Sequence, residues 1–258
     1  MWIAITRDVS ASLGDCQLSF VPRTGIDVEL ARRQHATSRD ALESLGCRVI
    51  ALTAEDAMPD AVFVEDVALV LDDVAVMTRP GAESRRGEGD TVEPVLSAFR
   101  PVLAITAPGT LDGGDVLRLG RNVYVGESVR SNPDGIAQLR ALLEPRGYSV
   151  QGVATNGCLH LKSAATEVAD GVLLVQPAWV DPAVFAGQRV IEVDPGEEHA
   201  ANALRIGDGI VYPAAFPRTR RRLEDAGIAV TTVDLSELQK AEGATTCCSL
   251  LFRDASVL

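Results

Sequence analysis

The sequence predicts an α/β fold arranged as a five-bladed propeller with pseudo-fivefold symmetry. Three observations lead to this prediction. First, a helix-like stretch gives way to a β-branched run five times along the chain. Second, a polar cluster follows each β-branched run. Third, paired runs of alternating apolar residues follow each cluster. One such unit cannot bury both faces of its own sheet, so neighbouring units must close on each other.

The junction between each helix-like stretch and its β-branched run is predicted to be a helix end. Four of the five junctions carry a glycine, which can take the positive φ that the residue after a helix needs. The four glycines are Gly46, Gly147, Gly187 and Gly227. The runs that follow the five junctions, each predicted to be a strand, are CRVIAL, PVLAIT, YSVQGV, QRVIEV and IAVTTV.

The paired apolar runs are predicted to be the remaining strands. They are VALVLDDVAVMT, VLRLGRNVYVG, SAATEVADGVLLVQ, ALRIGDGIVYP and SLLF. The short turns inside the second and fourth of these favour antiparallel hairpins. A doubly wound parallel sheet would also alternate helix and strand, but the hairpins argue against it. The last run, SLLF, lacks a partner, and the N-terminal WIAIT can supply one and close the ring.

We interpret residues 1–258 as one domain, because no linker or low-complexity tract interrupts the repeat. Residues 8–25 contain Ser, Gly and Pro and few periodic apolar residues, which predicts a long loop. Long loops in compact domains often cover an active site, so this loop is a candidate lid.

Composition and charge narrow the function classes. The formal net charge of −12 disfavours nucleic acid as a partner and suits a cationic small substrate, although acidity can also serve solubility alone. No apolar run reaches the ~18 residues of a membrane helix, and the N-terminal residues lack the features of a signal peptide. The five cysteines include no C-x-x-C pair, so neither a disulfide framework nor a zinc site is expected. This use of cysteine predicts a cytoplasmic location.

The polar clusters hold the candidate catalytic residues, because equivalent turns of a propeller would converge near its axis. They contribute Asp60, Glu65, Asp66, Asp112, Asp115, His160, Cys247 and Cys248. A thiolate beside an imidazole is a nucleophile and base pair, and a carboxylate can orient the imidazole. Further carboxylates would bind a cation, and a planar guanidinium matches two of them.

At these residues the chain resembles the dimethylarginine dimethylaminohydrolases of the guanidino-group-modifying enzyme superfamily. The segments that carry the resemblance are SLGDCQLSF, FVEDVALV (63–70), RPGAESRRGE (79–88), TLDGGDVL (110–117), GESVRSN (126–132), CLHLKSAA (158–165) and TTCCSLLF (245–252). Together they span nearly the whole chain. The family has a five-bladed α/β propeller, as the repeat predicts.

The resemblance implies three catalytic residues. Cys247, the first cysteine of TTCCS, would be the nucleophile and His160 the acid and base, with Asp112 holding the histidine where some relatives have Glu. The alternatives are a pair of structural thiols, a core histidine and an aspartate in a glycine turn. Cys248 is taken as structural, and Asp115 as a turn residue.

The resemblance also implies the substrate-binding residues. Glu65 and Asp66 would bind the guanidinium, and Arg85 and Arg130 the α-carboxylate. Asp60 would also bind the substrate, and Leu18 and Ala241 would contact it through their backbone atoms. Lys162 and Ser163 receive no role, and both other histidines, His35 and His199, are expected on the surface.

The implied reaction converts N(ω)-methylated arginine to citrulline and an amine, without metal or organic cofactor. Zinc bound adventitiously by the Cys–His pair would inhibit. Alternatives are an arginine deiminase-like activity, an amidinotransferase, or a binding protein that leaves methylarginine intact. A homodimer is conceivable, with edge strands or the two tryptophans, Trp2 and Trp179, at the interface.

Overall fold

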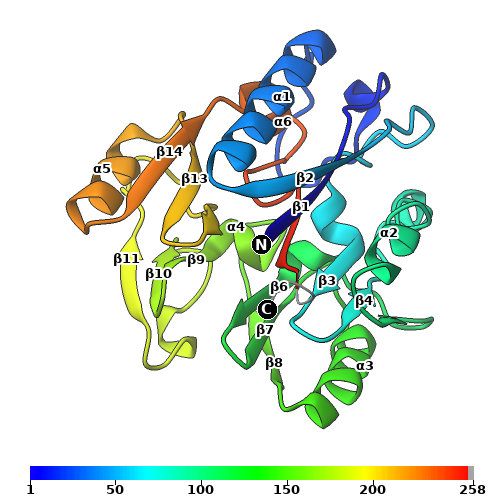
Figure 1. Ribbon diagram of the computed structural model, residues 1–258. Coiled ribbons are helices and arrows are strands. Elements are labelled where there is room, and N and C mark those ends of the chain that lie inside the picture. Colours follow the sequence, from blue (N-terminus) through cyan, green and yellow to red (C-terminus); the bar gives the residue numbers. More distant parts are fainter. Residues whose placement is uncertain (255–258) are drawn as a thin grey trace.

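The computed structural model describes residues 1–254, and its fifteen strands form five sheets of three strands each. Figure 1 shows the sheets arranged around a common centre, with the longer helices α1, α2, α3 and α5 at the periphery. The strands of the first blade are β1 (Trp2–Arg7), β2 (Cys47–Leu52) and β15 (Leu250–Arg253). The other four blades contain β3 (Ala68–Val70), β4 (Ala75–Met77), β5 (Val102–Ala104); β6 (Val116–Leu119), β7 (Asn122–Glu127), β8 (Ser149–Ala154); β9 (Ala165–Ala169), β10 (Val172–Val175), β11 (Arg189–Glu192); and β12 (Leu204–Ile206), β13 (Gly209–Pro213), β14 (Ala229–Val233).

Every blade repeats one topology. The middle strand pairs antiparallel with the other strand of its hairpin. It pairs parallel with the strand that follows it after the crossover connection. In the first blade the hairpin partner comes from the far end of the chain, since Ile3 of β1 lies opposite Phe252 of β15. The predicted five-bladed α/β propeller, and its closure by the N-terminal run, are therefore confirmed.

The crossovers, and the connections between blades that contain α4 and α6, have helices of very different length. The helices are α1 (Val28–Ser44), α2 (Glu93–Ser97), α3 (Pro133–Leu143), α4 (Leu161–Ala164), α5 (Pro217–Asp225) and α6 (Ser236–Gln239). Single 3-10 turns are η1 (Leu13–Asp15), η2 (Val64–Val67), η3 (Glu83–Arg85), η4 (Gly113–Asp115), η5 (Glu144–Arg146) and η6 (Pro182–Val184). The side chains of Asp27 and Asn132 cap α1 and α3 at their N-terminal ends, which satisfies backbone N–H groups there. All four predicted junction glycines have φ between 79° and 87°.

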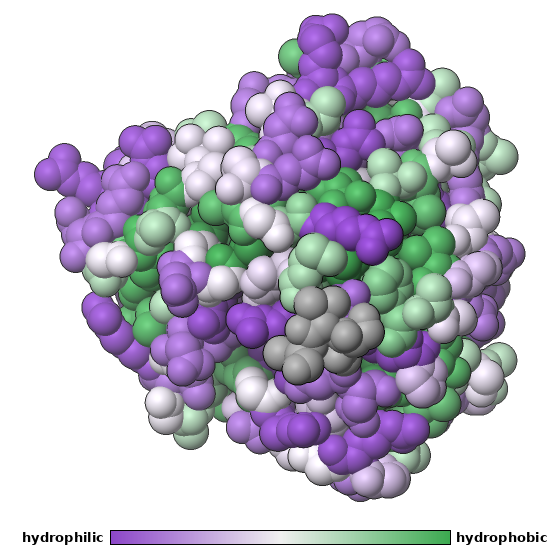
Figure 2. Space-filling model, in the orientation of Figure 1, coloured by the Kyte–Doolittle hydropathy of each residue, from purple (hydrophilic) through white to green (hydrophobic). Residues whose placement is uncertain are grey.

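Apolar side chains fill the spaces within and between blades, in five clusters of buried residues. In the space-filling view hydrophilic residues cover the peripheral helices, while hydrophobic residues show mainly toward the middle, where blades meet (Figure 2). Among the described residues no helix is both long and apolar enough to cross a membrane.

Two expectations about single residues are wrong. His35 was expected on the surface, but it lies on the buried face of α1 with Ala31, Gln34 and Leu42, and burial lowers the pKa of its imidazole to about 4. Trp179 is also buried, so it is not available for a subunit interface. His199 is exposed as expected, and its ring lies against Trp179 with the centroids 5.1 Å apart.

Candidate active site

The chemistry-bearing turns occupy equivalent places in four blades. Each directly precedes the first strand of a hairpin: η2 before β3, η4 before β6, α4 before β9, and the turn at 245–249 before β15. The repeated topology therefore brings residues from distant parts of the chain to one end of the ring. The side chains of Glu65, Asp66, Asp112 and His160 are all buried there.

His160 sits between two carboxylates. Its Nε2 lies 3.2 Å from Oδ2 of Asp112, and its Nδ1 lies 3.8 Å from Oδ1 of Asp66. Burial alone would lower the pKa of the imidazole, but the charge of Asp66 and the hydrogen bond to Asp112 outweigh it and raise the pKa to about 9. The ring is therefore protonated at neutral pH and can act as a general acid.

The glycines of the LDGGD segment make this arrangement possible. A Cβ on Gly114 would lie 2.4 Å from Nδ1 of His160 and 2.8 Å from Oδ1 of Asp66. A Cβ on Gly113 would lie 1.9 Å from the carbonyl oxygen of Glu65. In addition, the Gly114 amide donates to Oδ1 of Asp66 over 2.9 Å. A side chain at Gly114 would therefore collide with both Asp66 and His160, and one at Gly113 would displace the backbone of Glu65.

Asp66 is held ionised by its neighbours. Arg85 donates from Nη1 to Oδ2 of Asp66 over 2.7 Å, and both groups are buried. Although burial raises the pKa of Asp66, the charges of His160 and Arg85 prevail and lower it to about 2. Arg85 also donates to Glu88 from Nε and Nη2, and to the carbonyl oxygens of residues 60 and 63. With these donors engaged, the predicted contact of Arg85 with an α-carboxylate stays a prediction.

Glu65 joins the nucleophile's turn to its surroundings. Its amide donates to the carbonyl oxygen of Cys247 over 3.1 Å, and its carboxylate accepts from Thr246 Oγ1 at 2.7 Å and Lys162 Nζ at 2.5 Å. Burial and the charges of Glu65 and Asp66 raise the pKa of the Cys247 thiol well above its ordinary value. In the empty site the thiol is therefore protonated, and a bound cation would favour the thiolate.

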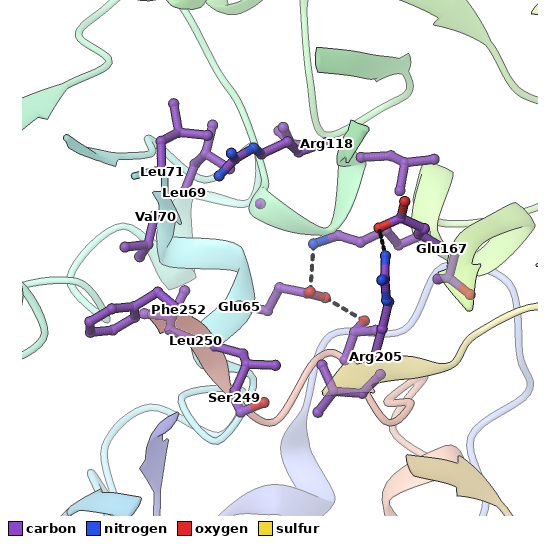
Figure 3. A pocket seen from close by; sticks show the side chains of 18 of the residues that line it. Glu65, Leu69, Val70, Leu71, Arg118, Glu167, Arg205, Ser249, Leu250 and Phe252 are labelled. Carbon is purple, nitrogen blue, oxygen red and sulfur yellow. Dashed lines mark hydrogen bonds and ion pairs between the residues drawn. The ribbon is translucent and has the colours of Figure 1, made fainter. Parts of the chain in front are cut away.

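The opposite side of Glu65 faces open space. A pocket of about 510 Å³ is lined by Glu65 and Lys162, together with Arg118, Arg205 and Phe252. Figure 3 shows Glu65, Arg118, Arg205 and Phe252 around this space. Within it Arg205 is paired with Glu167 at 2.8 Å. His160 and Cys247 do not line this pocket, so the Lys162–Glu65 ion pair stands between it and the buried catalytic candidates.

Arg130 differs from Arg85 in having a free donor. It is buried, and its Nη1 has no hydrogen-bond partner, with Oδ2 of Asp112 3.9 Å away. Its Nη2 donates to Ser19 Oγ in the predicted lid over 3.4 Å. The carboxylate of Asp60 accepts the amide of Gln17, from the same loop, at 3.1 Å. A buried guanidinium with an unused donor is suited to bind an anionic ligand group.

Leu18 and Ala241, the predicted backbone contacts, lie on the lid side of the nucleophile. Leu18 and Cys247 pack against the apolar cluster that contains Ala241, Phe63 and Cys248. Cys248 is a buried thiol, as expected, and its Sγ lies 3.8 Å from the carbonyl oxygen of Ala244. Leu18, Ala241 and Cys247 thus belong to one apolar cluster on the lid side of the site.

Known proteins share this sequence and geometry. The chain is 39% identical over 253 residues to the N(G),N(G)-dimethylarginine dimethylaminohydrolase of Streptomyces coelicolor, and the match covers 97% of each chain. It superposes with a TM-score of 0.93 on that enzyme from Pseudomonas aeruginosa, solved as a cysteine-to-serine mutant with citrulline, at 36% identity over 97% of this chain and 98% of the other. A further structure with the same score and identity is an adduct of a dimethylarginine dimethylaminohydrolase with S-methyl-L-thiocitrulline, and the match covers 97% and 99%. No protein-family model matches the sequence.

This chain belongs to the dimethylarginine dimethylaminohydrolase family. That membership confirms the resemblance drawn from the seven segments. Members of the family are hydrolases of the guanidino group, and this chain is one of them.

Sequence reasoning missed three residues of the site in this family member. Asp115 is no simple turn residue: it is fully buried and accepts from Ser128 Oγ, Ser131 Oγ and the amide of Leu161, which ties the segment before Arg130 to the segment after His160. The serines of GESVRSN were the available signal. Glu88 and Lys162 were missed because a single acid or base in a polar segment does not reveal its partner.

Three donor groups in the dimethylarginine dimethylaminohydrolase site could approach one metal ion. Within residues 1–254, Asp66, Asp112 and His160 have ligand atoms within 4.8 Å of one another. The same spacing is expected for a protonated imidazole paired with two carboxylates, so it does not require a metal. The absence of a metal requirement stays a prediction.

Replacing Asp66 by asparagine should lower the pKa of the His160 imidazole from about 9 toward the ordinary value of 6.5, because it removes the charge that raises it most. NMR titration of the ring in wild type and variant measures this, with the exposed, distant Asp208→Asn as control. The same pairing affects the free energy of unfolding. Because folding raises the pKa of His160, the stabilisation by its ion pairs is complete below pH 6.5 and is lost as pH rises through about 9. An unchanged ring pKa in the variant would contradict the assigned pairing.

Proposed function

We propose that the protein hydrolyses N(ω)-methylated L-arginine, both asymmetric dimethylarginine and monomethylarginine, to L-citrulline and dimethylamine or methylamine. The observation that carries the proposal is a buried, protonated His160 beside a carboxylate pair and the turn of Cys247. A cation bound between Glu65 and Asp66 would supply the positive charge that the Cys247 thiol needs to ionise.

The first half-reaction forms a covalent intermediate. The Cys247 thiolate attacks the guanidinium carbon, which gives a neutral tetrahedral species. His160 then donates its proton to the substituted nitrogen, the C–N bond breaks, and the neutral amine leaves. A thiouronium cation remains on the sulfur, and Asp112 holds the neutral ring in place.

The second half-reaction uses the same imidazole as a base. His160 takes a proton from water, whose oxygen attacks the thiouronium carbon. The C–S bond breaks with departure of the thiolate, the remaining hydroxyl proton passes to solvent, and citrulline is released. Each bond that forms is matched by one that breaks, and no metal or organic cofactor enters the sequence.

Binding of the amino-acid end follows from the free donors and acceptors around the lid. Arg130 would bind the α-carboxylate through its unpartnered Nη1, and Asp60 the α-ammonium. The backbone of Leu18 and Ala241 would complete the contact. Arg85 would fix Asp66 through Nη1 and place its positive charge near the substrate carboxylate.

The decisive experiment compares products. Wild-type protein is incubated with dimethylarginine, monomethylarginine and arginine, and citrulline, ammonia and methylamines are quantified by mass spectrometry. Citrulline with dimethylamine supports the proposal. Ammonia from arginine as the main product would identify a deiminase, transfer of the amidino group to an added amine would identify an amidinotransferase, and intact methylarginine would identify a binding protein.

Replacing Arg130 by alanine should raise KM for dimethylarginine about 100-fold, with a smaller effect on kcat, because a buried charge-assisted contact to the carboxylate is lost. Steady-state kinetics measure the change. Arg118→Ala, in the pocket on the other side of Glu65, is the matched control. An unchanged KM for Arg130→Ala would remove that residue from the binding site.

The remaining expectations are part of the same proposal. All five cysteines are free, which suits a reducing compartment such as the cytoplasm. The partner is a small cationic molecule, with neither nucleic acid nor membrane required, and a homodimer would be formed through faces other than Trp179. Added zinc is expected to inhibit by binding Cys247 and His160, and a chelator to reverse the inhibition.

A further inference from the structure

The lid is held by side chains and not by backbone pairing. In the described chain, residues 17–26 make no backbone–backbone hydrogen bond. Instead, Asp60 accepts the amide of Gln17, and Glu242 accepts the amides of Ser19, Phe20 and Val21. The lid's position over the nucleophile therefore depends on a few side chains from other segments, among them these two carboxylates.

Glu242 makes the largest of these contacts. Its Oε1 accepts from Ser19 N at 3.0 Å, Phe20 N at 2.5 Å and Val21 N at 2.9 Å, and its Oε2 accepts from Ser19 N at 3.1 Å. Three successive amides around one anion form a concave anion site, and hydrogen bonds to an ionised acceptor are stronger than neutral ones. Ser19 and Phe20 are exposed, so without this contact water would be the alternative partner of their amides.

The backbone at Glu242 is unfavourable for a glutamate. Its φ of 61° is the sole positive φ of a non-glycine residue within 1–254. Glu242 lies just after α6. Its amide donates to the carbonyl oxygen of Gln239, and the amide of Gly243 donates to the carbonyl oxygen of Leu238. This is the pattern that ends a helix with a left-handed residue. Glycine fills the corresponding left-handed position at the ends of four crossovers, so the helix end does not explain the glutamate.

A contact from Lys240 Nζ to the carbonyl oxygen of Gly25 also holds the lid, and two further contacts compete with substrate. Asp60 and Arg130 hold Gln17 and Ser19 in the empty site, yet under the proposed function they bind the substrate's ammonium and carboxylate. Glu242 has no such second task. It also lies next to Ala241, in the segment that leads to Cys247, so it connects the lid directly to the nucleophile's segment.

We propose that Glu242 is a positioning residue that holds residues 19–21 over the active site, a contact we call the latch. It keeps the lid closed when Asp60 and Arg130 bind the substrate and no longer bind the lid. The latch itself stands on the contacts of Glu242; only its effect on substrate rests on the proposed function. Loss of the latch leaves the catalytic groups in place and weakens retention of the substrate.

Two substitutions separate latching from ordinary stabilisation. Glu242→Gly removes the carboxylate and suits the left-handed backbone, while Glu242→Gln keeps the length of the side chain and removes the charge. Glu224→Gln, an exposed residue of α5 paired with Arg220, is the charge-matched control. For each protein, hydrogen exchange of the amides at 19–21, the unfolding temperature, and kcat and KM for dimethylarginine are measured.

For Glu242→Gly we expect exchange at 19–21 about tenfold faster or more, an equal or higher unfolding temperature, and KM raised about tenfold with kcat changed less than about threefold. Glu242→Gln should change exchange and KM in the same direction, and Glu224→Gln should change neither.

Unchanged exchange at 19–21 in both Glu242 variants would overturn the latch. A fall in unfolding temperature that accounts for the kinetic change would make Glu242 a structural residue only. Because exchange is recorded without substrate, absence of turnover in the wild type would refute the proposed function and leave this test intact.

Discussion

Cys247→Ser should reduce citrulline formation from dimethylarginine by about 10⁴-fold or more, while the protein remains folded. Removal of a nucleophile that acts in concert with a general acid abolishes the covalent route altogether. A serine hydroxyl at this position has no neutral imidazole to deprotonate it, because His160 is protonated at neutral pH. Substrate binding should persist, since the groups proposed to bind it are unchanged.

The measurement combines citrulline assay, circular dichroism and intact mass after mixing with substrate. The wild type should show a transient mass increase that matches the thiouronium, and the variant none. Cys248→Ala is the matched control, because it alters the neighbouring buried thiol and should retain turnover within about tenfold. Turnover by Cys247→Ser near the wild-type rate would show that another group is the nucleophile.

His160→Gly should reduce steady-state turnover about 10²- to 10⁴-fold, the usual contribution of one acid–base group. Both half-reactions depend on this ring, first as acid and then as base. An analogue with a good leaving group, such as S-methyl-L-thiocitrulline, needs no proton from His160 to leave. It should therefore still alkylate Cys247 in the variant, and the adduct should then persist because no base activates water.

Intact mass over time distinguishes the two roles. The persistent adduct is expected in His160→Gly and a short-lived one in the wild type, and exogenous imidazole should restore part of the turnover. His199→Ala, on the exposed histidine, is the control and should behave as wild type. An adduct that decays equally fast with and without His160 would show that another group activates the water.

The architecture was predictable because the repeat appears five times. Glycines at four helix ends, hairpin turns and the unpaired SLLF run all indicate the same ring, and the structure confirms each of them. The gathering of polar turns followed from that ring, since equivalent positions must converge. Local sequence patterns repeated in register are therefore sufficient to place Asp66, Asp112 and His160 together.

Pairwise contacts across the ring were not predictable in the same way. Lys162 and Glu65 are 97 positions apart, and no local pattern marks them as partners. His35 was misplaced because its helix is rich in charge, and the buried face shows only in the spacing of Ala31, His35 and Leu42. Asp115 was judged by its glycine neighbours, whereas its three hydrogen bonds come from residues 13 to 46 positions away.

The closure of the first blade also has a consequence for biosynthesis. β1 emerges early from the ribosome but must wait for β15, which follows Cys247 by only a few positions. A nascent chain therefore carries four complete blades and an open fifth before its reactive sulfur exists at all. The proposed nucleophile and the strand that closes the ring are therefore synthesised within a few residues of each other, after the strands of the other four blades.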